Sequence, residues 1–427
     1  MKYAMNFFPL REVKRFDLEK KPRRVSWYLR PVTWLLSYPA VWSHRVKIDK
    51  INMDKVKPPY LLLCNHNAFF DFMVATVATF PHQAYYVVAI DGFIGREWLM
   101  RRVGCIGKRK FTNDISLIRN VQTVIDRGKI AGIYPEARYS LCGTTAVLPE
   151  SLGKLAKMLK VPVVTLITNG HHINAPFWNQ KGRGVRTRAK MELIINSAEI
   201  QQLSVDEINS RINSCFKYDD FAWQRENKVP VKFKNRAKGL HKVLYHCPSC
   251  GTEYRMESDK DELWCNQCGK KWKMSVYGEL EATDGINIFS HIPDWYEWER
   301  EQVNREVVTG MYSLECEAIV RSLPNSKGFI HVGDATLVHN MDGFELKGSF
   351  DGAEYSLNLP SRSLYSVHIE YNYGRFKRNA VELNTLHDSI WIFPKGEDFS
   401  VTKISLATEE LFNYMKKMPV VELRQTV

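Results

Sequence analysis

From Lys47 to about Phe216, short apolar runs alternate with amphipathic stretches, and this alternation constrains the fold more than any other feature. Runs such as KPPYLLLC, AYYVVAI and VPVVTLIT have the length and composition of buried strands. Stretches such as DISLIRNVQTVIDRGK have helical periodicity, with Asp114 placed to cap the helix. The pattern predicts an α/β domain with a mostly parallel sheet.

The chain has 427 residues, too many for one ordinary hydrophobic core, so we expect several domains. The expected parts are a basic, aromatic segment, the α/β domain, a linker helix (RAKGLHKVLY) with a small cysteine-rich unit, and a β-rich C-terminal domain. Their expected ranges are 1–46, 47–228, 229–280 and 281–427.

A histidine and an acid stand where one of the predicted strands ends. The run LLLC is followed at once by Asn65 and His66, and Asp71 comes five residues after His66. Ligands of such sheets bind beyond the carboxyl ends of the strands. From the turn, the His66 ring can fold back over the helix start, where the Asp71 carboxylate can accept the proton of one ring nitrogen. The other nitrogen is then a general base. Alone, the pair is also compatible with a structural histidine.

Four sequence blocks in this region resemble those of the 1-acylglycerol-3-phosphate (lysophosphatidate) acyltransferase family, within the glycerolipid acyltransferases. The blocks are Asn65, His66 and Asp71; Gly104, Lys108, Arg109 and Lys110; YPEARYS, from Tyr134 to Ser140; and VPVVTL, from Val161 to Leu166. The third block lacks its usual glycine and its arginine comes one position early. The fourth has Thr165 where a second proline is common. These departures leave the acceptor open.

The resemblance implies acyl transfer, with His66 and Asp71 as the catalytic pair. His66 takes the proton of an acceptor hydroxyl, which attacks the thioester of acyl-coenzyme A or acyl carrier protein. The residues expected to bind substrate are Asn65, Lys108, Arg109, Glu136 and Arg138. The basic ones among them suit a phosphate, so the expected acceptor is lysophosphatidate-like and the expected role is in phospholipid biosynthesis. The alternative is the same chemistry on another lysolipid or an amino-lipid.

The N-terminal segment is basic and aromatic. The first 50 residues hold twelve basic and four acidic residues, a net +8 of the chain's +13. Residues 25–43 are rich in Trp and Tyr, which settle at the headgroup level of membranes, but Arg30, Pro31 and Pro39 interrupt them. We therefore expect a helix lying in the interface, and a peripheral or monotopic enzyme on the cytoplasmic face of the membrane. Whether the segment crosses the bilayer is left open, and a helix packed on the protein's own core is the alternative.

Two CxxC pairs predict a structural zinc. Cys247 and Cys250 are followed, after fourteen residues, by Cys265 and Cys268. Four thiolates complete a tetrahedron and leave no open position for catalysis. The odd total of nine cysteines favours a reducing compartment over a disulfide framework.

A zinc ribbon also raises the alternative of a scaffold or nucleic-acid-binding protein with a vestigial acyltransferase domain. The sequence between the two pairs is acidic, which suits a phosphate backbone poorly, so no nucleic-acid partner is expected.

From about Gly278 the pattern changes to a helix, several short alternating runs and a terminal helix. This predicts an antiparallel sheet or small barrel, somewhat like a pleckstrin-homology-type domain, without implying a function. The sequence leaves open the acyl chain length, the choice of thioester donor, the exact acceptor, the role of this domain and the oligomeric state.

Overall fold

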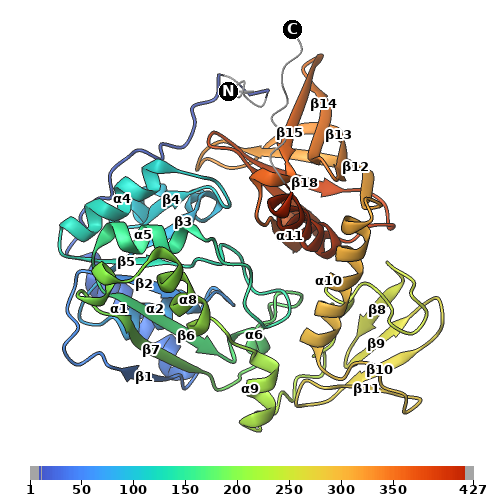
Figure 1. The fold of residues 1–427 in the computed structure, drawn as a ribbon, viewed down its shortest axis with the longest axis horizontal. Helices are drawn as coiled ribbons and strands as arrows, with labels where there is room; N and C mark the ends of the chain where they lie inside the picture. The colour runs from blue at the N-terminus through green and yellow to red at the C-terminus, as the bar shows by residue number, and fades with distance from the viewer. Residues whose placement is uncertain (1–8, 11, 419–427) are drawn as a thin grey trace.

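The computed structural model describes residues 9, 10 and 12–418 (Figure 1). The first sheet has seven strands in the order β1-β7-β6-β2-β5-β3-β4. It is mixed, because β7 runs antiparallel to β6 while the other five pairings are parallel. The strands are β1 (Lys47–Ile51), β2 (Tyr60–Cys64), β3 (Ala84–Ala89), β4 (Ile106–Lys108), β5 (Ile130–Ile133), β6 (Val163–Asn169) and β7 (Arg188–Ile195).

Helices cover both faces of this sheet, which is why its central strands read as continuous apolar runs. Leu61 and Leu63 of β2 pack against α4, α5 and α8, whereas Leu62 packs on the side of α1 and α2. The helices of this part are α1 (Leu29–Ser43), α2 (Asp71–Ala78), α3 (Glu97–Arg102), α4 (Ile115–Asp126), α5 (Ser151–Leu159), α6 (His171–Asn174), α7 (Glu199–Gln202), α8 (Val205–Cys215) and α9 (Asp220–Glu226), with a 3-10 turn η1 (Ile90–Phe93). The Asp114 side chain accepts the backbone N–H of Ser116 and caps α4, as predicted.

The cysteine-rich part forms a small antiparallel sheet in the order β11-β10-β9-β8. Its strands are β8 (Met256–Asp259), β9 (Glu262–Cys265), β10 (Lys271–Met274) and β11 (Leu280–Ala282). The predicted linker helix before it is wrong, because only a 3-10 turn, η2 (Leu240–Lys242), forms there. Gly239 has a φ of +91°, which ends helical geometry, and a Cβ at this position would lie 2.7 Å from the carbonyl oxygen of Trp178.

The C-terminal part has a seven-stranded sheet in the order β15-β14-β13-β12-β18-β17-β16. All its pairings are antiparallel and α11 follows the last strand, as predicted. The elements are α10 (Ile292–Val308), β12 (Ser313–Leu323), β13 (Ile330–Asn340), β14 (Gly343–Phe350), β15 (Ala353–Pro360), β16 (His368–Tyr373), β17 (Arg378–Asn384), β18 (Ser389–Pro394) and α11 (Val401–Lys417), with 3-10 turns η3 (Ser361–Ser363) and η4 (Gly374–Phe376).

The three sheets share packing rather than standing apart. One continuous set of buried apolar side chains runs from Phe177 and Trp178, through Trp272, to α10 and α11. Figure 1 shows α10 running from the small sheet to the C-terminal sheet, with α11 near the centre of the molecule. The N-terminal segment before α1 also contacts the C-terminal part, since the Phe16 N–H donates to the Pro324 carbonyl (2.8 Å).

Among the described residues, none of the helices has both the length and the apolar character that a membrane crossing requires.

Candidate functional site

The predicted contact between His66 and Asp71 is present. Asp71 is the first residue of α2, and its Oδ2 lies 3.3 Å from Nδ1 of His66. The same Oδ2 accepts the backbone N–H groups of Asn67 (2.6 Å) and Ala68 (2.9 Å). Burial alone raises the pKa of Asp71, but the hydrogen bonds from His171 and His66 outweigh it and hold that pKa below its usual range. The carboxylate is therefore ionised and can only accept, so Nδ1 of His66 carries a proton and Nε2 is the basic atom.

Two tyrosines from the turn after β5 flank the His66 ring. The ring centroids of Tyr134 and Tyr139 lie 4.5 and 4.4 Å from that of His66. The His66 side chain keeps 26% of its surface exposed, whereas that of Asp71 keeps 1%. The base thus remains accessible while the acid that orients it is sealed from water.

Glu136 supports this turn from beneath. It is fully buried, and its two carboxylate oxygens accept the backbone N–H groups of His66 (3.1 Å) and Ala146 (2.8 Å). The Tyr218 hydroxyl lies 3.0 Å from one of these oxygens. Burial raises the pKa of Glu136 to about 7 in spite of these donors. Its place is under the His66 backbone, which supports an ordering role rather than the predicted contact with substrate.

Asn65 is also turned inward. Its side chain pairs with the backbone of Thr168 on β6, accepting the N–H (2.8 Å) and donating to the carbonyl (2.9 Å). The Asn65 side chain is fully buried, so it ties the ends of β2 and β6 together. The predicted contact of Asn65 with substrate is not supported.

Residues 45–169 match the model of the Acyltransferase family. This acyltransferase-like segment contains His66, Asp71 and Glu136, and ends just before α6. No curated protein matches the chain. Among solved structures, one match is 1-acyl-sn-glycerophosphate (LPA) acyltransferase PlsC from Thermotoga maritima, at 14% identity and a TM-score of 0.33, covering 44% of this chain and 79% of that one.

Lys108 and Arg109, two of the predicted phosphate-binding residues, form hydrogen bonds within the protein. Arg109 is 1% exposed, and its guanidinium donates to the carbonyls of Leu323, Pro324 and His387 and to the Ser389 hydroxyl at 2.8–3.1 Å. The predicted phosphate-binding role of Arg109 is not supported, because both terminal nitrogens of its guanidinium already donate to the C-terminal part. Lys108 likewise donates to the carbonyl of Thr112 (2.7 Å).

Arg138 is held by α11. The Glu409 carboxylate accepts from Arg138 (2.6 Å) and from Arg300 of α10 (2.8 Å), and the hydroxyl of Ser405 is a further partner of Arg138. Arg138 and Glu409 are both almost fully buried, so the predicted contact of Arg138 with a phosphate is not supported either. These long-range contacts join the C-terminal part to the turn that carries Glu136.

Replacing Glu409 with Ala is expected to lower the free energy of unfolding by about 3–5 kcal/mol, because the buried Arg138 loses its counter-charge. Urea unfolding followed by circular dichroism measures this. Glu397→Ala, at an exposed position of the same part, is the control and should change stability by less than about 0.5 kcal/mol.

The Glu409 prediction has a pH signature. Burial raises the pKa of Glu409, but Arg138 and Arg300 outweigh it and keep it below the ordinary value. The contribution of the carboxylate is therefore present above the ordinary carboxyl pKa and is lost as the pH falls through the folded-state value. The difference in the free energy of unfolding between wild type and Glu409→Ala should therefore become smaller at acidic pH. An equal effect of the Glu397 control would contradict the assignment.

His171 is the site residue that the sequence prediction missed. Its Nδ1 is hydrogen-bonded to Oδ1 of Asp71, and both side chains are 1% exposed. His171 follows the end of β6, which pairs in parallel with β2. The strand-end rule that singles out His66 applies equally here, but it requires knowing that β2 and β6 are neighbours.

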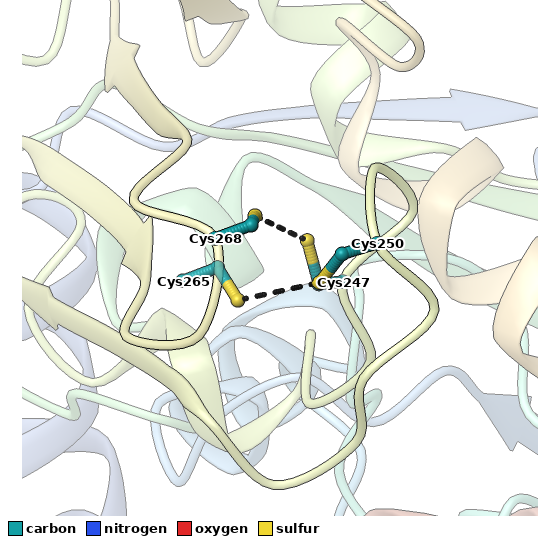
Figure 2. Close-up of side chains that lie close together, drawn as sticks. All are labelled: Cys247, Cys250, Cys265 and Cys268. Carbon is teal, nitrogen blue, oxygen red and sulfur yellow. Dashed lines mark hydrogen bonds between the residues drawn. The ribbon is translucent and has the colours of Figure 1, made fainter.

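The four cysteines of the two CxxC pairs converge on one point (Figure 2). Their sulfur atoms all lie within 4.8 Å of one another, and the pairs Cys247–Cys268 and Cys250–Cys265 are each 3.8 Å apart. A disulfide requires a separation of about 2.05 Å. Tetrahedral zinc with bonds of about 2.3 Å places its sulfurs about 3.8 Å apart, so the cluster fits zinc.

Each cysteine pair closes with a glycine in the left-handed conformation. Gly251 has a φ of +72° and Gly269 a φ of +75°, and each donates its N–H to the first cysteine of its pair (2.9 Å). Both turns therefore have the same geometry and present two sulfurs each toward the centre.

Acidic side chains of the small sheet are used within the protein. Glu253 forms an ion pair with Lys403 of α11 (2.8 Å), and Asp261 with Arg236 (2.7 Å). These pairs tie the small sheet to its neighbours.

Helix α1 exposes apolar side chains to solvent. Leu35, Leu36 and Trp42 are 72%, 65% and 83% exposed, whereas Ser37 and Val41 face α2 and are buried. On a surface helix the exposed side is normally polar. The outer side of α1 is instead a contiguous apolar stripe, which includes Tyr28, Val32 and Tyr38.

Proposed function

We propose that the protein is an O-acyltransferase that works at a membrane surface and moves a fatty acyl group from a thioester to the hydroxyl of a lysolipid. The observation that carries this proposal is the His66–Asp71 pair, oriented with Nε2 as the basic atom, inside a segment that matches the Acyltransferase family.

In the proposed reaction, Nε2 of His66 takes the proton of the acceptor hydroxyl as the oxygen attacks the thioester carbonyl. The new C–O bond forms, the C–S bond breaks, and the proton passes to the leaving thiolate. Asp71 fixes the ring and stabilises the imidazolium that forms. Glu136 and Tyr218 hold the His66 backbone in place.

Two classes of acceptor are considered, and they differ in whether basic residues such as Arg109 and Arg138 would bind a phosphate. A lysophosphatidate-like acceptor follows from the sequence blocks. An acceptor without a phosphate monoester is favoured by the contacts of Arg109 and Arg138, which bind the C-terminal part instead of facing an open site.

The test is an acyl-transfer assay with lysophosphatidate, lysophosphatidylcholine and monoacylglycerol, each offered with acyl-coenzyme A and with acyl carrier protein. Preference for lysophosphatidate by more than about tenfold indicates a phosphate contact, since charge-assisted hydrogen bonds contribute about 1.5–3 kcal/mol each. Equal rates favour the second class. Absence of transfer to every acceptor from both donors would exclude the proposed function and leave a scaffold role.

We further propose that α1 lies in the membrane interface with its apolar stripe inserted, and that the enzyme is peripheral or monotopic on the cytoplasmic face. Aromatic side chains such as Trp42 suit the headgroup level, and the basic residues of the N-terminal segment suit anionic lipids.

Replacing Leu35 and Trp42 together with Glu is expected to weaken binding to anionic phospholipid vesicles by roughly 100-fold or more, because two buried apolar contacts of about 1.5–3 kcal/mol each are lost. Vesicle co-sedimentation measures this. Met311→Glu is the control, at a position that is 77% exposed and lies outside α1. Equal binding by all three proteins would contradict the proposed role of α1.

The cysteine cluster is proposed to hold one structural zinc through Cys247, Cys250, Cys265 and Cys268. Zinc bound there would cross-link the two turns and supply no chemistry to the reaction, because four sulfurs leave no open position.

A further inference from the structure

The Asp71 carboxylate stands between two imidazoles. Its Oδ2 faces Nδ1 of His66 and also accepts two backbone N–H groups, while its Oδ1 is bonded to Nδ1 of His171. Every partner of this carboxylate is a donor. The two rings therefore compete for one negative charge from opposite sides.

The backbone turn that carries His171 is fixed by hydrogen bonds to Asp220. Gly170, with a φ of +86°, turns the chain at the end of β6, and the carboxylate of Asp220 accepts the N–H groups of Gly170 and His172 at 2.9 Å each. A Cβ at Gly170 would lie 2.8 Å from the Trp223 ring. The imidazole of His171 is thus presented to Asp71 by a turn whose backbone is hydrogen-bonded to Asp220.

A core histidine with no role in the site is the simplest alternative. Such a ring is expected to satisfy both nitrogens, since unpaired buried polar atoms are costly. Nε2 of His171 has no hydrogen-bond partner among the described residues. The single polar contact of this buried ring is therefore the one to Asp71, and its effect is exerted on that carboxylate.

We propose that His171 is a positioning residue that acts on His66 through Asp71, an inference that rests on the proposed function of the same site. The bond to Oδ1 stops the carboxylate from rotating and keeps Oδ2 on Nδ1 of His66. It also draws part of the negative charge away from His66, which tunes how strongly the base holds its proton.

The other groups around His66 come from separate elements and are untouched by a change at His171. Glu136 lies under its backbone, and the neutral tyrosines 134 and 139 flank its ring. The thiol of Cys64 is close to Asp71, and burial together with that acid keeps it protonated by raising its pKa. The buried His368 of β16 is also near His66. The pKa of His368 is lowered mainly by burial, then by Lys110 and Arg138, and to a smaller extent by His66.

The variants His171→Phe and His171→Asn separate packing from hydrogen bonding. Phe fills the space but removes the donor, whereas the Asn amide keeps an N–H at nearly the position of Nδ1. His171→Phe is expected to lower kcat by roughly 10- to 100-fold with little change in KM, as losses of such supporting partners typically do. His171→Asn should stay within about threefold of wild type, because the hydrogen bond is kept.

A shift in pH dependence distinguishes positioning from a structural role. With the donor gone, Asp71 acts on His66 alone and stabilises its protonated form. The acid limb of the kcat/KM profile of His171→Phe should move upward by about half to one pH unit. His172→Asn controls for loss of a buried imidazole, because the His172 ring forms no hydrogen bond to a carboxylate among the described residues, and it should leave the profile in place.

NMR titration of the His66 ring in purified full-length protein gives a readout that needs no substrate. Its midpoint should move upward in His171→Phe and return in His171→Asn. If wild type shows no acyl transfer, the proposed function fails, yet the titration still tests the coupling. An unchanged His66 midpoint in both variants, or kcat for His171→Phe equal to wild type, overturns the proposal.

Discussion

Replacing His66 with Ala is expected to lower the rate of acyl transfer by about 10²- to 10⁴-fold, the usual contribution of a positioned general base. The reason is geometric. Nδ1 of His66 is hydrogen-bonded to Asp71, so Nε2 is the atom that accepts the hydroxyl proton. The neighbouring side chains cannot replace it as the base. Asp71 is sealed from solvent, and burial raises the pKa values of Tyr134 and Tyr139, so both hydroxyls stay protonated and cannot serve as the base.

The same substitution should leave the fold intact. The His66 side chain is partly exposed and packs mainly on two tyrosine rings, so its loss is a modest change compared with the removal of a core residue. The measurement is thiol release from the thioester donor in the presence of acceptor, together with thermal unfolding. His82→Ala, at an exposed position before β3, is the control. Activity of His66→Ala comparable to this control would remove His66 from the mechanism.

The local part of this site was open to prediction because its signals are local. A buried apolar run, an abrupt stop and a polar pair five residues apart are read directly from LLLCNHNAFFD. Parallel strands place their carboxyl ends at one edge, so His66 was expected at a site-forming position. The contact with Asp71 followed from the helix start, and the structure has it.

The partners of Arg109 and Arg138 could not be predicted from the sequence. Arg109 and Arg138 have the composition and the place of phosphate ligands, but their partners lie more than 200 residues further along the chain. Nothing near Arg109 indicates that carbonyls of the C-terminal part will surround it. Sequence blocks identify residues that matter, whereas burial and long-range contacts decide what those residues touch.

Two smaller features concern the backbone: the predicted linker helix and the turn at Ala137. The linker helix was expected from composition, but the close approach of Gly239 to the Trp178 backbone imposes a turn there. The third block has Ala137 where glycine is usual, and Ala137 indeed has a φ of +55°, a left-handed conformation that glycine adopts without strain. The turn geometry is thus kept although the favourable residue is absent.

Loss of the proposed zinc is the second large expected effect. Structural zinc contributes about 10–16 kcal/mol of apparent binding free energy in small zinc-folded units. We expect the small sheet to depend on such a contribution, because its strands have only three or four residues each and cannot enclose a core of their own. Trp272 is its largest buried side chain, and the ring of Trp272 lies 4.9 Å from that of Trp295 on α10.

Cys250→Ser is the most informative change, because Cys250 is exposed and contributes little packing. We expect wild type to contain one zinc per chain and this variant to lose most of it. Cys316→Ser is the matched control, at a partly exposed cysteine outside the cluster, and should keep the metal. Zinc content by elemental mass spectrometry and near-ultraviolet circular dichroism of the tryptophans measure the two effects.

Unfolding of the small sheet should spread to α10 before it reaches the α/β part. The Trp295 indole donates to the His246 carbonyl (3.0 Å) and Glu299 accepts the His246 N–H (2.8 Å), so the residue before Cys247 is anchored on α10. Because Arg300 of the same helix binds Glu409, loss of the metal should also loosen the support of Arg138 and lower acyl transfer. Equal zinc content and equal tryptophan signals in Cys250→Ser and Cys316→Ser would show that the four sulfurs hold no metal.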